Sequence, residues 1–326
     1  MQLVINTYGS YIQKNGDCFK VKKDEQIFEI SAKKVSSILI TTAAYITTDS
    51  IKLAIDNNID IIFMDNFGEP FGRVWHPKLG STTLIRRRQL EISNTQDGLN
   101  FVKKWVKTKF DNQINLLTSL RTTRTKKSKE ITEYILQLKN IKKKFDDLTD
   151  NFVPEIRDII MGIEGSGAKV YFDCISFLMP ERFKFLGRSR NPAKDEFNAL
   201  LNYSYGILYS RVEKACIIAG LDPYVGILHT DHYNKKSMVF DIIENYRIWA
   251  DEIVINLFAG RKIKQEHFDK LKNGLSLNAA GKALLIKTYT EFMEESVRYK
   301  GRNIKRDNII QFDCHNIANE LIKKNK

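Results

Sequence analysis

The spacing of apolar residues changes once along the chain, and this change limits the folds that the sequence can adopt. Up to residue 75 the apolar residues come in short β-branched or alternating runs, which are typical of strands. From residue 83 they recur every three or four residues, which is typical of amphipathic helices. Residues 76–82 have the Pro, Gly and polar content of a linker. We therefore expect an α+β fold, with a small β-rich domain over 1–75 and a larger all-helical domain over 83–326.

The same periodicity predicts the individual elements. In the first domain it predicts a helix after the capping residues at 48–50, and strands at 2–8, 18–22, 27–31, 35–41, 60–64 and 71–75. In the second it predicts helices at 83–92, 99–120, 127–148, 154–163, 192–219, 240–258, 266–273, 279–297 and 308–323. The helix at 192–219 is the best marked, because Pro192 suits a first helical position and Gly220 suits a helix end.

Composition narrows the class of protein. With 43% hydrophobic residues in 326, the chain can bury a core and is not mainly disordered. No apolar run approaches the about 20 residues of a membrane span, and the first residues lack the pattern of a signal peptide. The four cysteines form no Cys-x-x-Cys pair, so neither a zinc ribbon nor a disulfide scaffold is indicated. We expect a cytoplasmic protein with reduced thiols.

The charge points to a polyanionic partner. Lys and Arg number 52 against 39 Asp and Glu, a net charge of +13, which favours nucleic acid. The run Arg86, Arg87 and Arg88 is one basic cluster, and Lys142-Lys143-Lys144 is another. A lysine-rich proteome also produces basic proteins that bind nothing anionic, and a charge run can be a solvated helix face. The charge alone leaves both interpretations open.

Two neighbouring segments carry side chains suited to metal binding. Residues 226–232, Gly-Ile-Leu-His-Thr-Asp-His, form an apolar stretch that ends in a polar cluster around His229. Asp241 follows twelve residues after His229, and Glu244 three residues later. On a helix that spacing places both carboxylates on one face, within reach of a single ion. Considered alone, the acidic pair fits a solvated helix face better than a metal site.

A third segment holds Glu164, which is bracketed by glycines and which we expect between two helical stretches. Considered alone, Glu164 fits a charge at a helix end. Together, three carboxylates and the His229 imidazole suit Mg²⁺ or, better, Mn²⁺, which accepts nitrogen readily. A basic chain with such a site is suited to phosphodiester chemistry.

Four segments of the chain form a distinctive set in this order. They are Gly-Ile-Glu-Gly at 162–165, Arg-Ser-Arg-Asn-Pro through Asn-Tyr-Ser-Tyr at 188–205, Gly-Ile-Leu-His at 226–229, and Asp-Ile-Ile-Glu at 241–244 with Arg247 and Asp251. Together they resemble signature blocks of the CRISPR-associated spacer-acquisition integrases, the Cas-one family. The resemblance spans essentially the whole chain, and it implies an N-terminal β domain and a C-terminal helical domain. It also implies a metal-dependent DNA endonuclease and integrase with Glu164, His229 and Asp241 as catalytic metal ligands. Glu244 ranks just behind them.

The resemblance further implies how the reaction proceeds and with which partners. A protospacer 3′-hydroxyl attacks a phosphorus at the edge of a CRISPR repeat, with Mg²⁺ or Mn²⁺ as the cofactor. Arg188 and Arg190 are the best candidates for holding phosphates, while Asn198 and Tyr205 are expected to support the site. The working particle is expected to contain homodimers, formed through the β-rich domain, and a small Cas-two partner in a heterohexamer-type complex in the prokaryotic cytoplasm.

Three other functions stay open. A stand-alone nuclease acting on branched DNA would use the same ligands with water as the nucleophile. An architectural DNA-binding protein would use the acidic residues only structurally. A zinc hydrolase would rest on His229, Asp231 and His232, but it lacks a third strong ligand.

Overall fold

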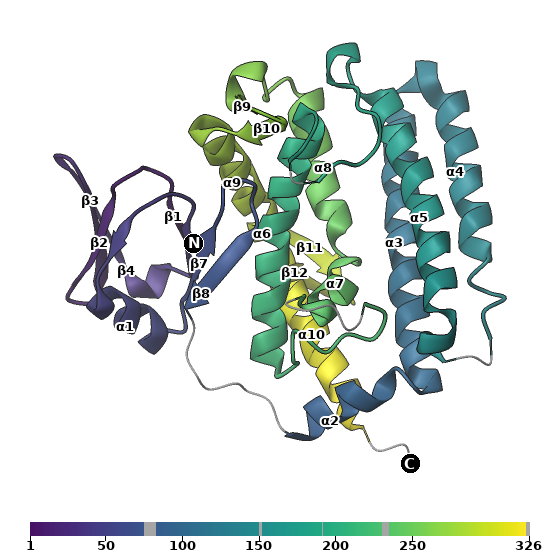
Figure 1. Ribbon diagram of the computed structural model, residues 1–326, viewed down its shortest axis with the longest axis horizontal. Coiled ribbons are helices and arrows are strands. Elements are labelled where there is room, and N and C mark those ends of the chain that lie inside the picture. The colour runs from purple at the N-terminus through teal and green to yellow at the C-terminus, as the bar shows by residue number, and fades with distance from the viewer. Residues whose placement is uncertain (75–82, 150–151, 191, 230–234, 324–326) are drawn as a thin grey trace. The chain divides into compact units, whose positions relative to one another are not determined.

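The computed structural model describes residues 1–74, 83–149, 152–190, 192–229 and 235–323 (Figure 1). The chain forms two compact units, each assembled from three stretches. Unit 1 comprises Met1–Leu79, Arg190–Ser210 and Ile263–Arg306, and unit 2 comprises Gly80–Ser189, Arg211–Lys262 and Asp307–Lys326. The expected linker at 76–82 lies outside the described residues, so the division of the chain at that linker stays a prediction.

Two four-stranded sheets occupy the N-terminal part of unit 1. The first has the order β1 (Gln2–Ile5), β5 (Ser37–Ile40), β7 (Asp60–Met64) and β8 (Pro70–Val74), and only β8 is antiparallel to its neighbour. The second has the order β4 (Gln26–Ser31), β3 (Cys18–Lys23), β2 (Tyr11–Asn15) and β6 (Tyr45–Ile46). The continuous apolar runs of β5 and β7 are almost wholly buried, as expected of parallel strands covered on both faces.

One helix completes this region. In α1 (Thr48–Asp56), the Thr47 hydroxyl accepts a hydrogen bond from the Ser50 amide at 3.3 Å and so caps the first turn. The core between the elements contains Ile12, Phe19 and Ile38, which are fully buried. Strand β2 is not predicted from the sequence, since Ile12 is its single buried residue.

The later part of unit 1 departs from the predicted helices. After the first turns of α6 (Glu196–Ala219) come β9 (Phe268–Leu271), β10 (Gly274–Leu277), α9 (Ala279–Glu294), β11 (Ser296–Tyr299) and β12 (Arg302–Lys305). The helix predicted at 266–273 is therefore wrong, and the one predicted at 279–297 ends at Glu294. The early end of the second helix reflects turn chemistry: Lys300 and Gly301, which join β11 to β12, both have positive φ, 47° and 82°, as a two-residue hairpin turn requires. Over 268–277 the chain pairs as an antiparallel hairpin instead of a helix, with Leu271 opposite Gly274.

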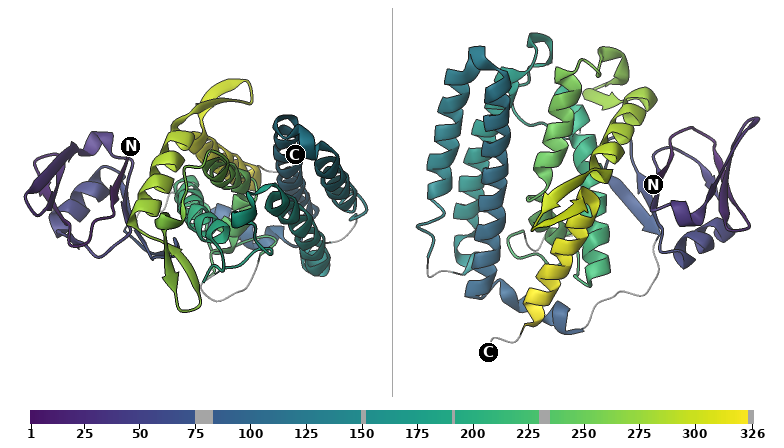
Figure 2. Two further views of the ribbon diagram at one scale, coloured as in Figure 1. Left: turned by 90° about the horizontal axis from the view of Figure 1, so that it is seen from above. Right: turned by 180° about the vertical axis from the view of Figure 1, so that it is seen from behind.

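Unit 2 is helical. It holds α2 (Thr83–Ile92), α3 (Gln96–Thr123), α4 (Ser128–Lys143), α5 (Val153–Leu178), the end of α6, α7 (Ser237–Ile243), α8 (Arg247–Ala259) and nearly all of α10 (Arg306–Ile322). Helices α3, α4 and α5 run side by side (Figures 1 and 2). Short 3-10 segments occur in unit 2 at Thr125–Lys127 and Glu181–Phe183, and in unit 1 at Ala32–Lys34 and Gln265–His267. Over the described ranges, no helix is both long and apolar enough to cross a lipid bilayer.

Two helix boundaries differ from the predictions in ways that matter for the site. The helix predicted at 154–163 continues to Leu178, so Glu164 lies in mid-helix rather than between two helices. The helix predicted at 240–258 is interrupted after Ile243, and α8 begins at Arg247. The α+β class with a mostly helical C-terminal part is confirmed, but this part is not all-helical because it contains the two hairpins.

Candidate active site

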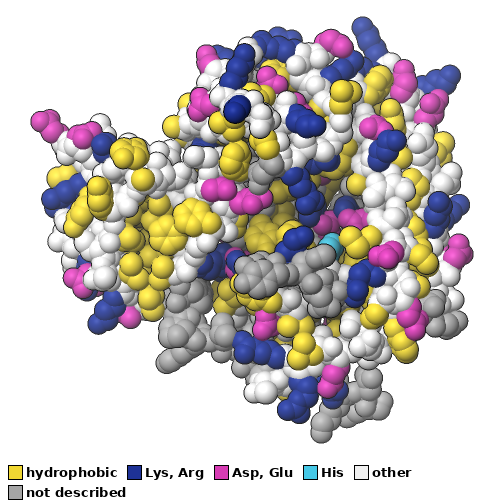
Figure 3. Space-filling view, viewed as in Figure 1, with side chains coloured by type: hydrophobic (Ala, Val, Ile, Leu, Met, Phe, Trp, Pro, Cys, Tyr) yellow, Lys and Arg dark blue, Asp and Glu magenta, His cyan; other side chains and the backbone are white. Residues whose placement is uncertain are grey.

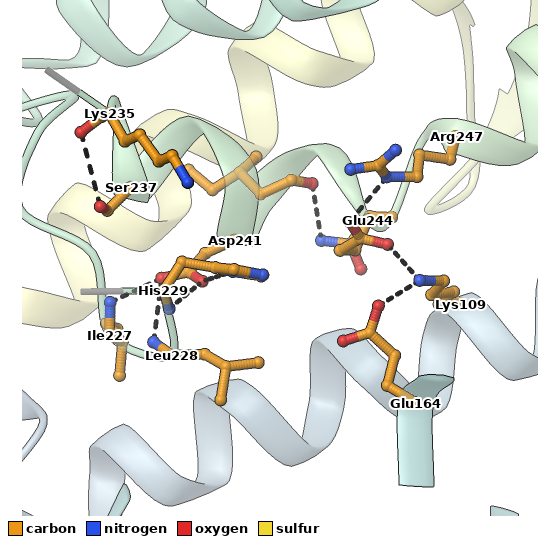
Figure 4. Close-up of polar contacts among 12 residues, drawn as sticks. Lys109, Glu164, Ile227, Leu228, His229, Lys235, Ser237, Asp241, Glu244 and Arg247 are labelled. Carbon is orange, nitrogen blue, oxygen red and sulfur yellow. Dashed lines mark hydrogen bonds and ion pairs between the residues drawn. The ribbon is translucent and has the colours of Figure 1, made fainter. Parts of the chain in front are cut away.

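Asp241, on α7, accepts several hydrogen bonds from the loop at residues 227–229, which precedes this helix. Its Oδ2 accepts the backbone N–H groups of Ile227 at 2.5 Å and Leu228 at 3.1 Å, and its Oδ1 accepts that of His229 at 3.0 Å. The Nδ1 of His229 lies 2.7 Å from the same Oδ1 (Figure 4). The Asp241 side chain is completely buried, and a buried carboxylate is stable only when it is bonded in this way. Asp241 therefore fixes both the loop and the ring of His229.

The His229 ring is held in the manner of a metal ligand. Burial disfavours its charged form, but the hydrogen bond and the charge of Asp241 outweigh burial and raise the pKa of His229. Because Nδ1 is engaged with a carboxylate, Nε2 is the nitrogen left to bind a ligand. Metal-binding histidines commonly have this arrangement, in which the carboxylate orients the ring and increases its basicity.

A second polar cluster joins α3, α5 and the turn after α7. The Nζ of Lys109, on α3, donates to Oε1 of Glu164, on α5, and lies 2.6 Å from Oε2 of Glu244 (Figure 4). The Nε of Arg247 donates to Oε1 of Glu244 at 2.6 Å. The side chains of Lys109, Glu164 and Glu244 are only 11%, 15% and 5% exposed. Two nearly buried carboxylates thus face one ammonium group.

The charges of this cluster stabilise one another. Burial alone would raise the pKa of Glu244, but the nearby Arg247 and Lys109 lower it to about 2. Burial alone would lower the pKa of Lys109, but Glu244 and Glu164 raise it above its ordinary value. The Glu244 carboxylate is therefore ionised and the Lys109 ammonium protonated at neutral pH.

Close packing of α5 on α3 brings the cluster together. A Cβ atom at Gly167 would lie 2.3 Å from the ring of Phe110, so only glycine allows the two helices to approach this closely. Asn112, one turn beyond Lys109 on α3, donates to the carbonyl of Asn245 at 2.9 Å. That bond ties the turn between α7 and α8, and with it Glu244, to the same face of α3.

The donor groups suit a divalent ion. Within the described ranges, no three His, Cys, Asp or Glu side chains lie close enough together to hold a metal ion as they stand. Even so, Glu164 and Glu244 already face a common positive charge. The buried Oε2 atom of Glu244 is contacted by the flexible Lys109 side chain, whose Nζ lies 2.6 Å away. A carboxylate oxygen held by a movable ammonium group and the Nε2 of an oriented imidazole are ligands that Mg²⁺ and Mn²⁺ accept.

The expected phosphate-binding residues of unit 2 lie on other elements. The guanidinium of Arg188 lies 5.3 Å from the ring centre of Phe172. On α2, Arg86 pairs with Asp222 at 3.7 Å and Arg88 with Glu91 at 3.1 Å. Arg87 is exposed and, over the described ranges, has no ion pair. On the face shown in Figure 3, Lys and Arg side chains are interspersed with Asp and Glu rather than collected into one patch.

The remaining predicted residues belong to unit 1 or fall outside the described ranges. Arg190 is exposed and Tyr205 is half-buried. Asn198 is fully buried, and its backbone and side-chain N–H groups both donate to Asp195 at 2.7 Å. Asp195 thereby caps α6, which begins at Glu196 rather than at 192. Nothing is described of Asp231 or His232, so the zinc alternative is not tested.

Sequence reasoning missed Lys109. It is one of many lysines and lies in no motif. Its contacts with Glu164 and Glu244 join residues that are 55 and 135 positions apart in the sequence. Arg247 belongs to a recognised block, but its contact with Glu244 depends on the interruption between α7 and α8. The one local signal is the helical spacing of Lys109 and Asn112, which places both on one face of α3.

Comparison with known proteins decides the family. The model of the family described as CRISPR associated protein Cas1 matches residues 3–291. This chain belongs to the Cas1 family. It is 33% identical over 330 residues to CRISPR-associated endonuclease Cas1 1 of Archaeoglobus fulgidus, with 98% of this chain and 95% of the relative covered.

Two solved structures show the same fold. A casposase bound to integration product matches with a TM-score of 0.83 at 22% identity, covering 100% of this chain and 92% of the casposase. A chain of a Cas6-RT-Cas1–Cas2 complex matches with a TM-score of 0.81 at 22% identity, covering 98% of this chain and 35% of that one. Family membership confirms the resemblance in the four sequence segments. As a family member, the chain is a metal-dependent enzyme of the CRISPR-associated endonuclease kind. This excludes the alternative of a purely architectural DNA-binding protein.

Proposed function

We propose that this chain inserts protospacer DNA into a CRISPR repeat array by transesterification. A 3′-hydroxyl attacks a phosphorus at the repeat edge and the repeat 3′-oxygen leaves, so one phosphodiester replaces another and no ATP is needed. The observation that carries the proposal is the pair Glu164 and Glu244, which face one cation and whose charges act on the oriented ring of His229. The fold shared with a casposase bound to integration product supports joining as well as cutting.

The residues that would hold Mg²⁺ or Mn²⁺ are Glu164, Glu244 and His229 through Nε2. When bound, the ion would stabilise charge on the attacking and leaving oxygens. The sequence ranks Asp241 ahead of Glu244 as a ligand, and the contacts favour the reverse order. Both Asp241 oxygens are engaged by backbone N–H groups and the His229 ring, which cannot leave without disrupting the loop, whereas Oε2 of Glu244 is contacted by the flexible side chain of Lys109.

The other residues of the chain take supporting roles in this proposal. Asp241 orients the His229 ring, and Arg247 holds Glu244. Arg86, Arg87, Arg88, Arg188 and Arg190 bind DNA phosphates, which guanidinium groups recognise well. Asn198 and Tyr205 support the site through α6.

The proposed assembly contains two copies of this chain and a Cas2-type partner, in the prokaryotic cytoplasm. The N-terminal sheets expose Ile27 and Phe28 on β4 and Tyr45 on β6, and the turn after β1 exposes Tyr8. Hydrophobic side chains gather over this region in Figure 3. Such a surface suits contact with a second copy. The solved complex that names Cas1 and Cas2 together supports the second partner.

A joining assay tests this function. Labelled protospacer duplex is incubated with a plasmid carrying the repeat array, the Cas2-type partner and Mn²⁺. We expect a covalently joined product with the wild-type chain and none with Glu164→Ala. Cleavage of branched DNA without any joined product would instead assign the chain as a stand-alone nuclease that uses water as the nucleophile.

A further inference from the structure

Lys109 occupies the position between the two carboxylates where a positive charge is most strongly favoured. Its ammonium donates to Glu164 and lies 2.6 Å from Glu244, and its side chain is 11% exposed. With Arg247, the cluster carries two negative and two positive charges, so its formal sum is zero. A divalent ion that entered this cluster unchanged would leave two uncompensated positive charges in a poorly solvated site.

The structure can release Lys109 without losing the carboxylates. Arg247 holds Glu244 independently at 2.6 Å, and Asn112 holds the turn at Asn245 at 2.9 Å. Lysine has a flexible four-carbon stem, so its ammonium can move to the edge of the site while α3 stays in place. A DNA phosphate arriving there would supply the negative charge that Lys109 gives up on leaving the carboxylates.

We propose that Lys109 is a resident cation that holds the Glu164–Glu244 pair together, gives way to the divalent metal ion, and then binds a non-bridging oxygen of the reacting phosphate. The inference rests on the proposed function, since it takes Glu164 and Glu244 as metal ligands. It adds a residue that competes with the metal in the free protein and contacts the substrate in the complex.

Calorimetric titration of the metal-free, full-length protein with MnCl₂ tests the first half. Lys109→Met and Lys109→Gln remove the competing charge and should each bind Mn²⁺ about tenfold more tightly than the wild type. Lys107→Met is the matched control, because Lys107 lies on the same helix and pairs with Asp146 instead; its Mn²⁺ affinity should be unchanged. Equal or weaker Mn²⁺ binding by both Lys109 variants overturns the proposal.

Two further arms keep the result interpretable. If the Lys109 variants fold only when Mn²⁺ is present, the metal replaces the ammonium and the proposal stands; if they fail to fold even with Mn²⁺, Lys109 is a structural counter-charge and the proposal falls. Glu164→Gln and Glu244→Gln should weaken Mn²⁺ binding. If they do not, the metal site of the proposed function fails; if they do and the Lys109 variants bind no more tightly, only the present inference fails.

The second half is tested with DNA. At saturating Mn²⁺, Lys109→Met should join labelled ends about tenfold more slowly than Lys107→Met, because the ammonium no longer stabilises the transition-state charge. Its affinity for the protospacer duplex should stay close to that of Lys107→Met, since many dispersed Lys and Arg side chains hold the duplex. Joining at the rate of Lys107→Met would overturn the phosphate contact.

Discussion

The Nδ1 of His229 lies 2.7 Å from Oδ1 of Asp241, and that carboxylate also accepts three consecutive backbone N–H groups. A carboxylate with this many donors has its charge compensated within the protein. Glu244, one turn further along the chain, is instead contacted by two side chains, Lys109 and Arg247, each at 2.6 Å. Asp241 and Glu244 thus differ in role, since Asp241 holds the loop and the His229 ring while Glu244 is available to a metal ion. Substituting each residue separately distinguishes the two roles.

Asp241→Asn should destabilise the fold, because an amide cannot accept all of these bonds. Hydrogen bonds to a charged group are worth about 1.5–3 kcal/mol each, so we expect a loss on the order of 3 kcal/mol in urea unfolding. Glu244→Gln should unfold closer to wild type but lose Mn²⁺ affinity. If Asp241→Asn is as stable as wild type and loses Mn²⁺ affinity as strongly as Glu244→Gln, Asp241 is a direct ligand after all.

Glu164→Ala should abolish joining and leave duplex binding almost intact. One ligand at one phosphorus is removed, while the affinity for DNA comes from many Lys and Arg side chains. Asp158→Ala is the control, because Asp158 is an exposed acid on the same helix α5 and should join as the wild type does. Equal loss of binding and joining in Glu164→Ala would remove this residue from the catalytic role.

The fold class could be predicted from the sequence because the spacing of apolar residues, which changes after residue 75, shows whether one face of a strand or one face of a helix is buried. The sequence pattern placed Glu164 between two helices because each glycine destabilises a helix by about 1 kcal/mol. In the structure the helix continues through these glycines, since Gly167 allows α5 to pack closely on Phe110 of α3. The role of Lys109 could not be predicted from the sequence for a different reason. Its partners lie on α5 and after α7, and no local pattern encodes an ion pair between elements so distant in sequence.

The stability of the metal-free protein should depend on pH through His229. Its pKa is raised in the folded state, despite burial, by Asp241. The pair therefore contributes its full stability below the unfolded pKa of about 6.5, and this contribution is lost as pH rises through the folded pKa. Urea unfolding of wild type and His229→Gln across pH 5 to about 9 measures it. Equal pH dependence in the two proteins would show that His229 does not carry the effect.

Metal identity should follow from the ligand set. Two carboxylates and one imidazole should support joining with Mn²⁺ at least as well as with Mg²⁺, and EDTA should stop the reaction. Zn²⁺ should substitute poorly, since it prefers a tetrahedral shell with little room for phosphate oxygens. The measurement is the rate of joining of labelled ends under each metal at equal free concentration. Joining that continues in EDTA would exclude this site as the source of the chemistry.

Salt dependence should identify which basic residues contact DNA. Lys143 and Lys144, at the end of α4, are exposed, whereas Lys142 pairs with Asp111 at 2.5 Å. Reversing the charge of Lys143 and Lys144 should therefore lower the dependence of log affinity on log salt, by about 0.9 for each duplex phosphate that these lysines neutralise. Affinity for a protospacer duplex over a series of salt concentrations gives this slope directly.

Helix α2 offers an internal comparison for the same experiment. Arg88 is paired with Glu91, while Arg87 has no ion pair among the described residues. Arg87→Glu should therefore lower the salt slope more than Arg88→Glu, and neither should change the preference among metals, because α2 contributes no side chain to the cluster of Lys109, Glu164 and Glu244. A slope unchanged by these substitutions and by those at Lys143 and Lys144 would mean that both clusters are solvated surface. DNA binding would then depend on other basic residues, with Arg188 and Arg190 the next to test.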